Sequence, residues 1–225
     1  MVEAVLWMFA FYGAQSGAKW LADNAYIDVP AWFPGHGLQN LVMIGGTLIL
    51  LAYWKLIRKA KLRSIGLRLD RLAGDLKFTV VAAIAMGAFY LLAAGVYWVA
   101  LRLFFDNPDL AFNSHLRGAV FQEHSWLFYL GVVITMPIVE EVWFRGLLYT
   151  PMRKELGRWG AIILLSLLFA AAHNNAFPIN QFFGGLIFVW AYEKRQSLIA
   201  PILLHILGNG SLVVLGWAFE KWQLV

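Results

Sequence analysis

The sequence contains no cysteine and few charged residues. The absence of cysteine excludes disulfide bonds, a thiol nucleophile and every metal site that depends on thiolate ligands. Of the 225 residues, 14% are charged, 61% are hydrophobic and 16% are aromatic. Because soluble domains carry about 25% charged residues, this composition predicts a membrane protein.

The positive charges that produce the net charge of +5 are concentrated in short segments between apolar runs. The three groups are Lys55, Arg58, Lys59, Lys61, Arg63, Arg68 and Arg71; Arg153, Lys154 and Arg158; and Lys194 and Arg195. Such groups are typical of cytoplasmic loops under the positive-inside rule, and they do not resemble a nucleic-acid-binding face. We therefore expect a lipid bilayer as partner and no nucleic acid. The first group is also placed to meet anionic lipid headgroups.

The apolar runs predict the transmembrane segments, because a helix needs about 20 mostly apolar residues to cross a bilayer. Candidate segments lie at about 2–20, 38–54, 77–105, 126–150, 160–176, 179–192 and 198–219. The sequence therefore predicts an all-α, polytopic bundle of about seven helices. We divide it into N-terminal helices with a basic loop (1–75) and a core (76–225). The basic groups orient the N-terminus toward the cytoplasm.

A few polar residues interrupt the apolar segments of the predicted core. They are Glu140 and Glu141, Arg145, His173, and His205 with Asn209. An ionisable residue at membrane depth costs about 2.5–3.5 kcal/mol on insertion scales, so its presence indicates a function. At a rise of 1.5 Å per residue, these groups lie roughly 12–20 Å from the cytoplasmic ends of three helices. Their agreement in depth predicts one shared site.

The spacing of the acidic and basic residues predicts which charges are neutralised. Glu141 and Arg145 are four residues apart with the acid first, which is the favourable order for an ion pair on one helix face. Glu140 points about 100° away from Glu141 and has no partner on its own helix.

The remaining side chains supply the groups that peptide hydrolysis requires. An unpaired Glu140 is a candidate general base for a water molecule, and His173 is placed to share the proton. His205 and Asn209 lie on one helix face and can donate hydrogen bonds to a developing oxyanion.

Other interpretations of these residues stay open. Glu141 with Arg145 is equally compatible with a purely structural ion pair, and His173 or Asn209 with an interhelical hydrogen bond. Glutamate and histidine also build proton pathways in transporters, although we find no inverted repeat. A divalent metal such as zinc, held by Glu140, His173 and His205, is a further alternative. The compact spacing of common zinc motifs is absent.

Three sequence motifs resemble those of a known family. The stretches EEVWFR (140–145), FAAAH (169–173) and HILGN (205–209) match the patterns E-E-x-x-x-R, F-x-x-x-H and H-x-x-x-N in order. They resemble the CAAX-protease and bacteriocin-processing family of intramembrane proteases, which includes type II CAAX prenyl endopeptidases and many bacterial self-immunity proteins. The resemblance covers about residues 120–217.

The resemblance implies an endopeptidase that acts on a peptide or membrane-protein substrate. Glu140 would activate water with help from His173, while His205 and Asn209 would stabilise the oxyanion. Glu141 and Arg145 would fix the first helix, and Phe169 would pack beside the site. We favour glutamate catalysis without a cofactor, in a bacterial inner membrane, with the site open to the cytoplasm. A catalytically silent scaffold or immunity protein of the same fold is the alternative, and the oligomeric state is undetermined.

Overall fold

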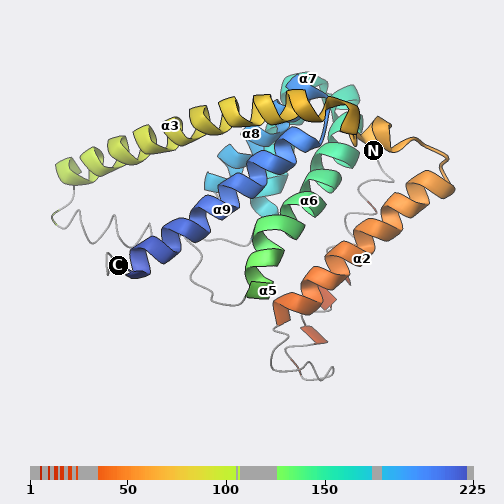
Figure 1. Ribbon diagram of the computed structural model, residues 1–225, viewed down its shortest axis with the longest axis horizontal. Coiled ribbons are helices and arrows are strands. Elements are labelled where there is room, and N and C mark those ends of the chain that lie inside the picture. The colour runs from red at the N-terminus through yellow and green to blue at the C-terminus, as the bar shows by residue number, and fades with distance from the viewer. Residues whose placement is uncertain are drawn as a thin grey trace.

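The computed structural model is a helical bundle (Figure 1) that describes residues 35–104, 106, 126–173 and 179–221, and scattered residues between Leu6 and Asn24. Its α-helices are α2 (Gly35–Leu56), α3 (Leu72–Phe104), α5 (Trp126–Tyr129), α6 (Met136–Glu141), α7 (Thr150–Ala172), α8 (Ile179–Arg195) and α9 (Ile199–Lys221). Two short 3-10 helices, η1 (Leu62–Ile65) and η2 (Leu69–Arg71), follow α2, and two π-helical segments, η3 (Leu130–Thr135) and η4 (Val142–Tyr149), flank α6. No described residue forms a strand, so the predicted all-α class is confirmed. The predicted segment at 2–20 lies largely outside the described residues.

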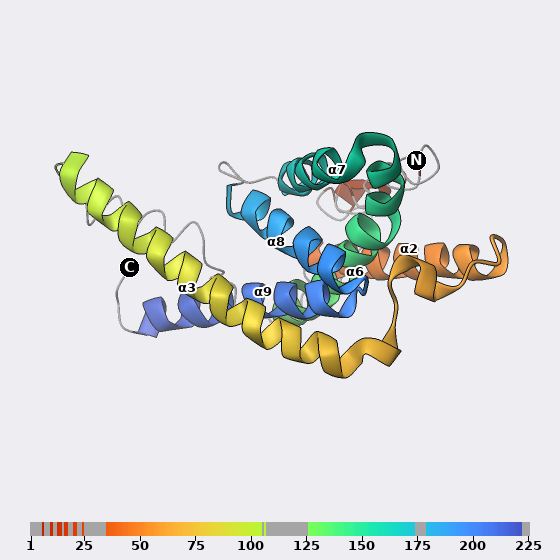
Figure 2. The same ribbon diagram turned by 90° about the horizontal axis from the view of Figure 1, so that it is seen from above.

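The helices that carry the motifs lie side by side. Helix α8 packs between α7 and α9, and α3 crosses α9 on the outside of the bundle (Figure 2). Helix α2 contacts α6 and η3 on the other side (Figure 1). The three predicted motifs are therefore brought together on α6 with η4, α7 and α9.

Segment η4 forms the centre of the core, since every residue from Val142 to Tyr149 is buried. Trp143 reaches α2, where its indole N–H donates a hydrogen bond of 2.9 Å to the hydroxyl of Thr47. Phe144 packs edge-on against Phe169 of α7, with ring centroids 5.2 Å apart. The helix that contains the paired glutamates is thus held from two sides.

Three described helical stretches are long and apolar enough to cross a membrane: Leu69–Phe104, Leu130–Ala172 and Ile199–Ala218. In the first of these, only 11% of the most apolar window is buried inside the protein, and Leu91 is 77% exposed. Soluble proteins rarely expose apolar surfaces of this extent, which mark contact with a membrane or a partner. The segment predicted at 179–192 corresponds to α8, whose 17 residues are fewer than the about 20 that a span requires.

Two predicted helix boundaries are wrong. The segment between 150 and 160 was expected to be a loop, but helical structure continues through it, interrupted only at Gly157 (φ 70°, ψ 178°). Positive φ is accessible to glycine without the steric cost of a Cβ atom, so the chain changes direction at this one residue. The predicted helix 160–176 ends early, because His173 is extended (φ −95°, ψ 103°) and terminates α7. Asn174 and Asn175 follow it in the sequence, and asparagine favours turns over helix interiors.

Candidate active site

The first motif lies on a helix with irregular winding. Helix α6 carries Glu140 and Glu141 and continues without a break into the π-helical segments η3 and η4. Pro137 lies near the start of α6, where its ring removes one backbone N–H and crowds the carbonyl four residues earlier. That crowding accounts for the wider turn at η3. Single π-helical turns inside α-helices are rare and are frequently found at functional sites.

The predicted ion pair between Glu141 and Arg145 is present, and both side chains are fully buried. The Arg145 Nη1 donates to Glu141 Oε1 at 2.9 Å, and its Nη2 donates to the Gly185 carbonyl of α8 at 3.1 Å. Its guanidinium also lies 4.7 Å from the centre of the Phe169 ring, a cation–π distance. Arg145 therefore joins the first motif to both α7 and α8.

Glu140 faces the two histidines of the other motifs. Its Oε2 lies 3.8 Å from His173 Nε2 and 3.7 Å from His205 Nε2. This oxygen is buried and has no hydrogen-bond partner among the described residues. Both distances exceed that of a direct hydrogen bond, and polar groups at such separations are commonly bridged by water. The Glu140 carboxylate thus lies between two histidine rings that come from different helices.

The hydrogen bonds of the two Nδ1 atoms assign the histidine tautomers. His173 Nδ1 lies 2.7 Å from the Phe169 carbonyl, which can only accept, so this nitrogen carries the proton. His205 Nδ1 lies 3.0 Å from Glu141 Oε1, and the ionised carboxylate paired with Arg145 likewise accepts. In the neutral rings, both Nε2 atoms consequently present a lone pair toward Glu140.

Aromatic rings hold these histidines in place. His205 stacks on Phe188 of α8 with ring centroids 4.5 Å apart and planes inclined by 21°. Phe169 lies 4.6 Å from the His173 ring and 5.7 Å from the His205 ring. Phe169 is buried, so the position expected for it, beside the site, is the one it occupies.

Asn209 lies one turn beyond His205 on α9. Its Nδ2 donates to the Val132 carbonyl of η3 at 2.8 Å. A carboxamide nitrogen carries two hydrogens, and this bond uses one of them. The contact fixes α9 against the irregular helix, and the oxyanion role expected for Asn209 stays a prediction.

A metal ion is the alternative occupant of the site. Among the described residues, no group of three histidine, aspartate or glutamate side chains is arranged to hold a metal ion. This statement includes Glu140, His173 and His205. Their three facing atoms are all acceptors in the neutral tautomers, and a water molecule donates to two acceptors at a time.

Sequence reasoning missed two contributions of α8. The Gly185 carbonyl accepts from Arg145, and the Phe188 ring supports His205. Neither residue is ionisable, so the search for charges at membrane depth passed over them. The neighbouring Gly184 and Gly185 were the available signal, because small residues allow close packing of membrane helices. A Cβ atom on Gly185 would lie 3.0 Å from the Ser166 Cα of α7.

Comparison with known proteins identifies the same part of the chain. Residues 122–211 match the family model described as type II CAAX prenyl endopeptidase Rce1-like. The chain is 36% identical over 95 residues to the membrane-embedded CAAX protease MroQ of Staphylococcus aureus (strain USA300), which corresponds to 39% of this chain and 38% of that protein. No solved structure matches the chain.

The matched segment contains all three motifs and every residue of the site. The chain covers 38% of the length of its curated relative, so the similarity is confined to this core. Residues 122–211 are thus similar to the type II CAAX prenyl endopeptidases and to a membrane-embedded CAAX protease, in agreement with the family that the three motifs resemble.

Proposed function

We propose that the protein is an intramembrane endopeptidase in which Glu140 and His173 activate the water that attacks a peptide bond. The observation that carries the proposal is the convergence of Glu140 Oε2, His173 Nε2 and His205 Nε2 around one buried polar position. A general base must lie within reach of the proton it abstracts, directly or through one water. These three acceptors provide such a position.

The hydrolysis can be written with these groups. The Glu140 carboxylate takes a proton from the water while the water oxygen bonds to the scissile carbonyl carbon. His173 Nε2 shares that proton, which is then passed to the amine nitrogen as the carbon–nitrogen bond breaks. The products are a carboxylic acid and an amine, so the reaction consumes one water molecule.

His205 and Asn209 are the proposed oxyanion donors. His205 would donate from Nε2 when that nitrogen carries a proton, while its Nδ1 bonds to Glu141 at 3.0 Å. Asn209 retains a second N–H beside the one that bonds to Val132. Removing one such donor typically costs about 10²–10³-fold in rate.

We further propose a peptide or membrane-protein substrate, with CAAX-type processing as the precedent among relatives. The relative MroQ is described as a membrane-embedded CAAX protease. The side chains of Glu140 and His173 are 17% and 29% exposed, so the site is accessible to a substrate. We propose a bacterial inner membrane with the site toward the cytoplasm, on the basis of the basic loops.

The experiment compares wild-type protein with Glu140→Gln in liposomes that contain prenylated peptides, unprenylated peptides and membrane proteins. Glutamine keeps the shape of the side chain but removes the base, so cleavage should fall by about 10²–10⁴-fold. Glu155→Gln, on the exposed surface of α7, is the charge-matched control and should cleave normally. Undiminished cleavage by Glu140→Gln would contradict the proposal. Cleavage that disappears with a chelator would replace glutamate catalysis by metal catalysis.

A further inference from the structure

The helix that carries Glu140 lies against α2, a helix outside the matched residues 122–211. Three residues of α2, Met43, Thr47 and Leu50, are buried and recur at the spacing of one helix face. Helix α2 contacts both η3 and α6. The chain therefore adds to the matched core a helix that packs along the irregular segment.

One polar contact joins this face of α2 to the first motif. The Trp143 indole N–H donates to Thr47 Oγ1 at 2.9 Å, and the Thr47 hydroxyl donates to the Met43 carbonyl at 2.8 Å. A hydroxyl has one hydrogen and two lone pairs. Its hydrogen is used within α2, so a lone pair of Thr47 accepts from Trp143. Both side chains are buried, which keeps water from competing for this bond.

The contact lies close to the proposed base. Trp143 follows Glu140 by three residues, and the backbone between them passes from α6 into η4. Because η3 and η4 depart from α-helical winding, the direction of Glu140 depends on contacts outside its own helix. Arg145 makes such a contact with α8, and Trp143 makes the corresponding contact with α2.

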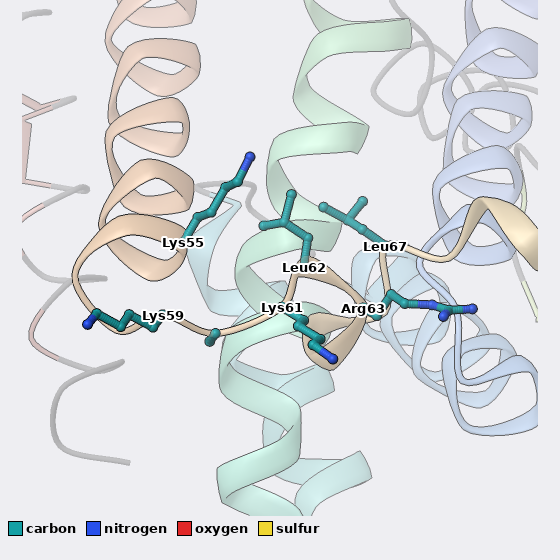
Figure 3. A pocket seen from close by; sticks show the side chains of 7 residues that line it. Lys55, Lys59, Lys61, Leu62, Arg63 and Leu67 are labelled. Atoms are coloured by element: carbon teal, nitrogen blue, oxygen red, sulfur yellow. The ribbon is translucent and has the colours of Figure 1, made fainter.

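Further contacts fix α2 on either side of Thr47. Near the start of α2, Asn40 approaches η3 so closely that a Cβ atom on Gly131 would collide with the Asn40 amide. Beyond the end of α2, the loop crosses the helix that continues from α6, and η1 contacts η4 there. Figure 3 shows Leu62 of η1 on the loop that makes this crossing. Thr47 therefore lies in a part of α2 that is held at both ends.

We propose that Thr47 is a positioning residue, which acts through Trp143 on the direction of Glu140. This inference rests on the proposed function, in which Glu140 is the base. Thr47 itself takes no part in the bond-making steps. A displacement of about 1 Å near a reacting group can cost about 10²-fold in rate. The Glu140 carboxylate, between two histidines at 3.7 and 3.8 Å, is sensitive to such a displacement.

The test compares kcat and KM of full-length variants for a prenylated CAAX peptide in liposomes, expressed per folded molecule. Thr47→Val keeps the shape of the side chain but removes the hydroxyl, so kcat should fall by about 10–100-fold while KM changes little. Thr47→Ser keeps both hydrogen bonds and should retain the wild-type kcat. Thr79→Val is the matched control and should also retain it, because the buried Thr79 hydroxyl of α3 has no hydrogen-bond partner among the described residues.

Hydrogen exchange followed by mass spectrometry adds a readout that needs no substrate. The backbone amides of 136–149 should exchange faster in Thr47→Val than in wild type, Thr47→Ser or Thr79→Val, because a contact that restrains this stretch is lost. Trp143→Phe removes the donor instead of the acceptor and should produce the same two effects. Since both changes break one bond, the double variant Thr47→Val/Trp143→Phe should lose less than the two single losses combined.

The outcomes separate this inference from the proposed function. Wild-type kcat and exchange in Thr47→Val, together with lost cleavage in Glu140→Gln, would overturn the role of Thr47 and leave the function standing. Equal losses in Thr47→Val and Thr47→Ser, or in Thr47→Val and Thr79→Val, would also overturn the role of this hydroxyl. Undiminished cleavage by Glu140→Gln would instead overturn the proposed base, and the positioning role with it.

Discussion

Replacing Arg145 with methionine should destabilise the protein strongly, because Arg145 and Glu141 form an ion pair with no exposed surface. The guanidinium donates to Glu141 at 2.9 Å and to the Gly185 carbonyl at 3.1 Å. Methionine fills similar volume but leaves both acceptors without this donor. Removal of one partner from a buried pair costs about 3–5 kcal/mol, and we expect a loss of this size in the free energy of unfolding.

The assay is reversible unfolding in mixed detergent and dodecyl sulfate micelles, followed by tryptophan fluorescence. Arg153→Met is the matched control, because Arg153 pairs with Glu193 at 3.0 Å while its own side chain is 50% exposed. Exposed pairs contribute about 0–1 kcal/mol, so this variant should remain close to wild type.

A double-mutant cycle separates the free energy lost with the ion pair from the free energy lost through poorer packing. In Glu141→Gln/Arg145→Met no buried charge is left unpaired, and replacement of a whole buried pair is often nearly neutral. The double variant should therefore be more stable than Arg145→Met alone. Additive losses, or an Arg145→Met variant within about 1 kcal/mol of wild type, would refute the reasoning.

Two further predictions concern the attachment of the basic loop and of α3. Gly66 has φ +92°, and an added Cβ would lie 2.8 Å from the Tyr192 ring, so Gly66→Ala should cost about 1–3 kcal/mol. Gly45→Ala, at an open helical position, should instead stabilise by about 0.5–1 kcal/mol, and equal effects would contradict the account. Asp75 is fully buried and accepts a 2.6 Å hydrogen bond from Arg195, so Asp75→Ala should cost about 1.5–3 kcal/mol. Thermal melts in detergent measure all three, and an unchanged melting temperature for Asp75→Ala would show that this contact does not hold α3.

The convergence of the polar side chains was predictable from sequence, because ionisable residues are costly to place at membrane depth. Glu141 and Arg145 are spaced for an ion pair and form one, and Glu140, which was left without a partner, faces His173 and His205. Agreement in depth along three helices identified this group because charge at membrane depth is selected against unless it has a use.

Backbone irregularity was not predictable in the same way. The π-helical winding around α6 and the positive φ at Gly157 leave the apolar pattern of the sequence unchanged. The hydrophobic periodicity of the sequence therefore predicted where the helices lie, but not where they bend. The His173 conformation at the end of α7 was missed because helix ends depend on local capping, which shifts boundaries by a few residues.

The adjacent glutamates have different surroundings because they lie about 100° apart on one helix. Glu141 Oε1 accepts from both Arg145 and His205, so a single oxygen atom connects the ion pair of the core to a histidine of the site. Arg145 in turn is bonded to α8, which sets the rotation of α6 and directs Glu140 toward the histidines. An Arg145 variant should consequently lose the proposed peptidase activity through misfolding and through misplacement of His205. Only activity expressed per folded molecule distinguishes these losses from the loss of the proposed base in Glu140→Gln.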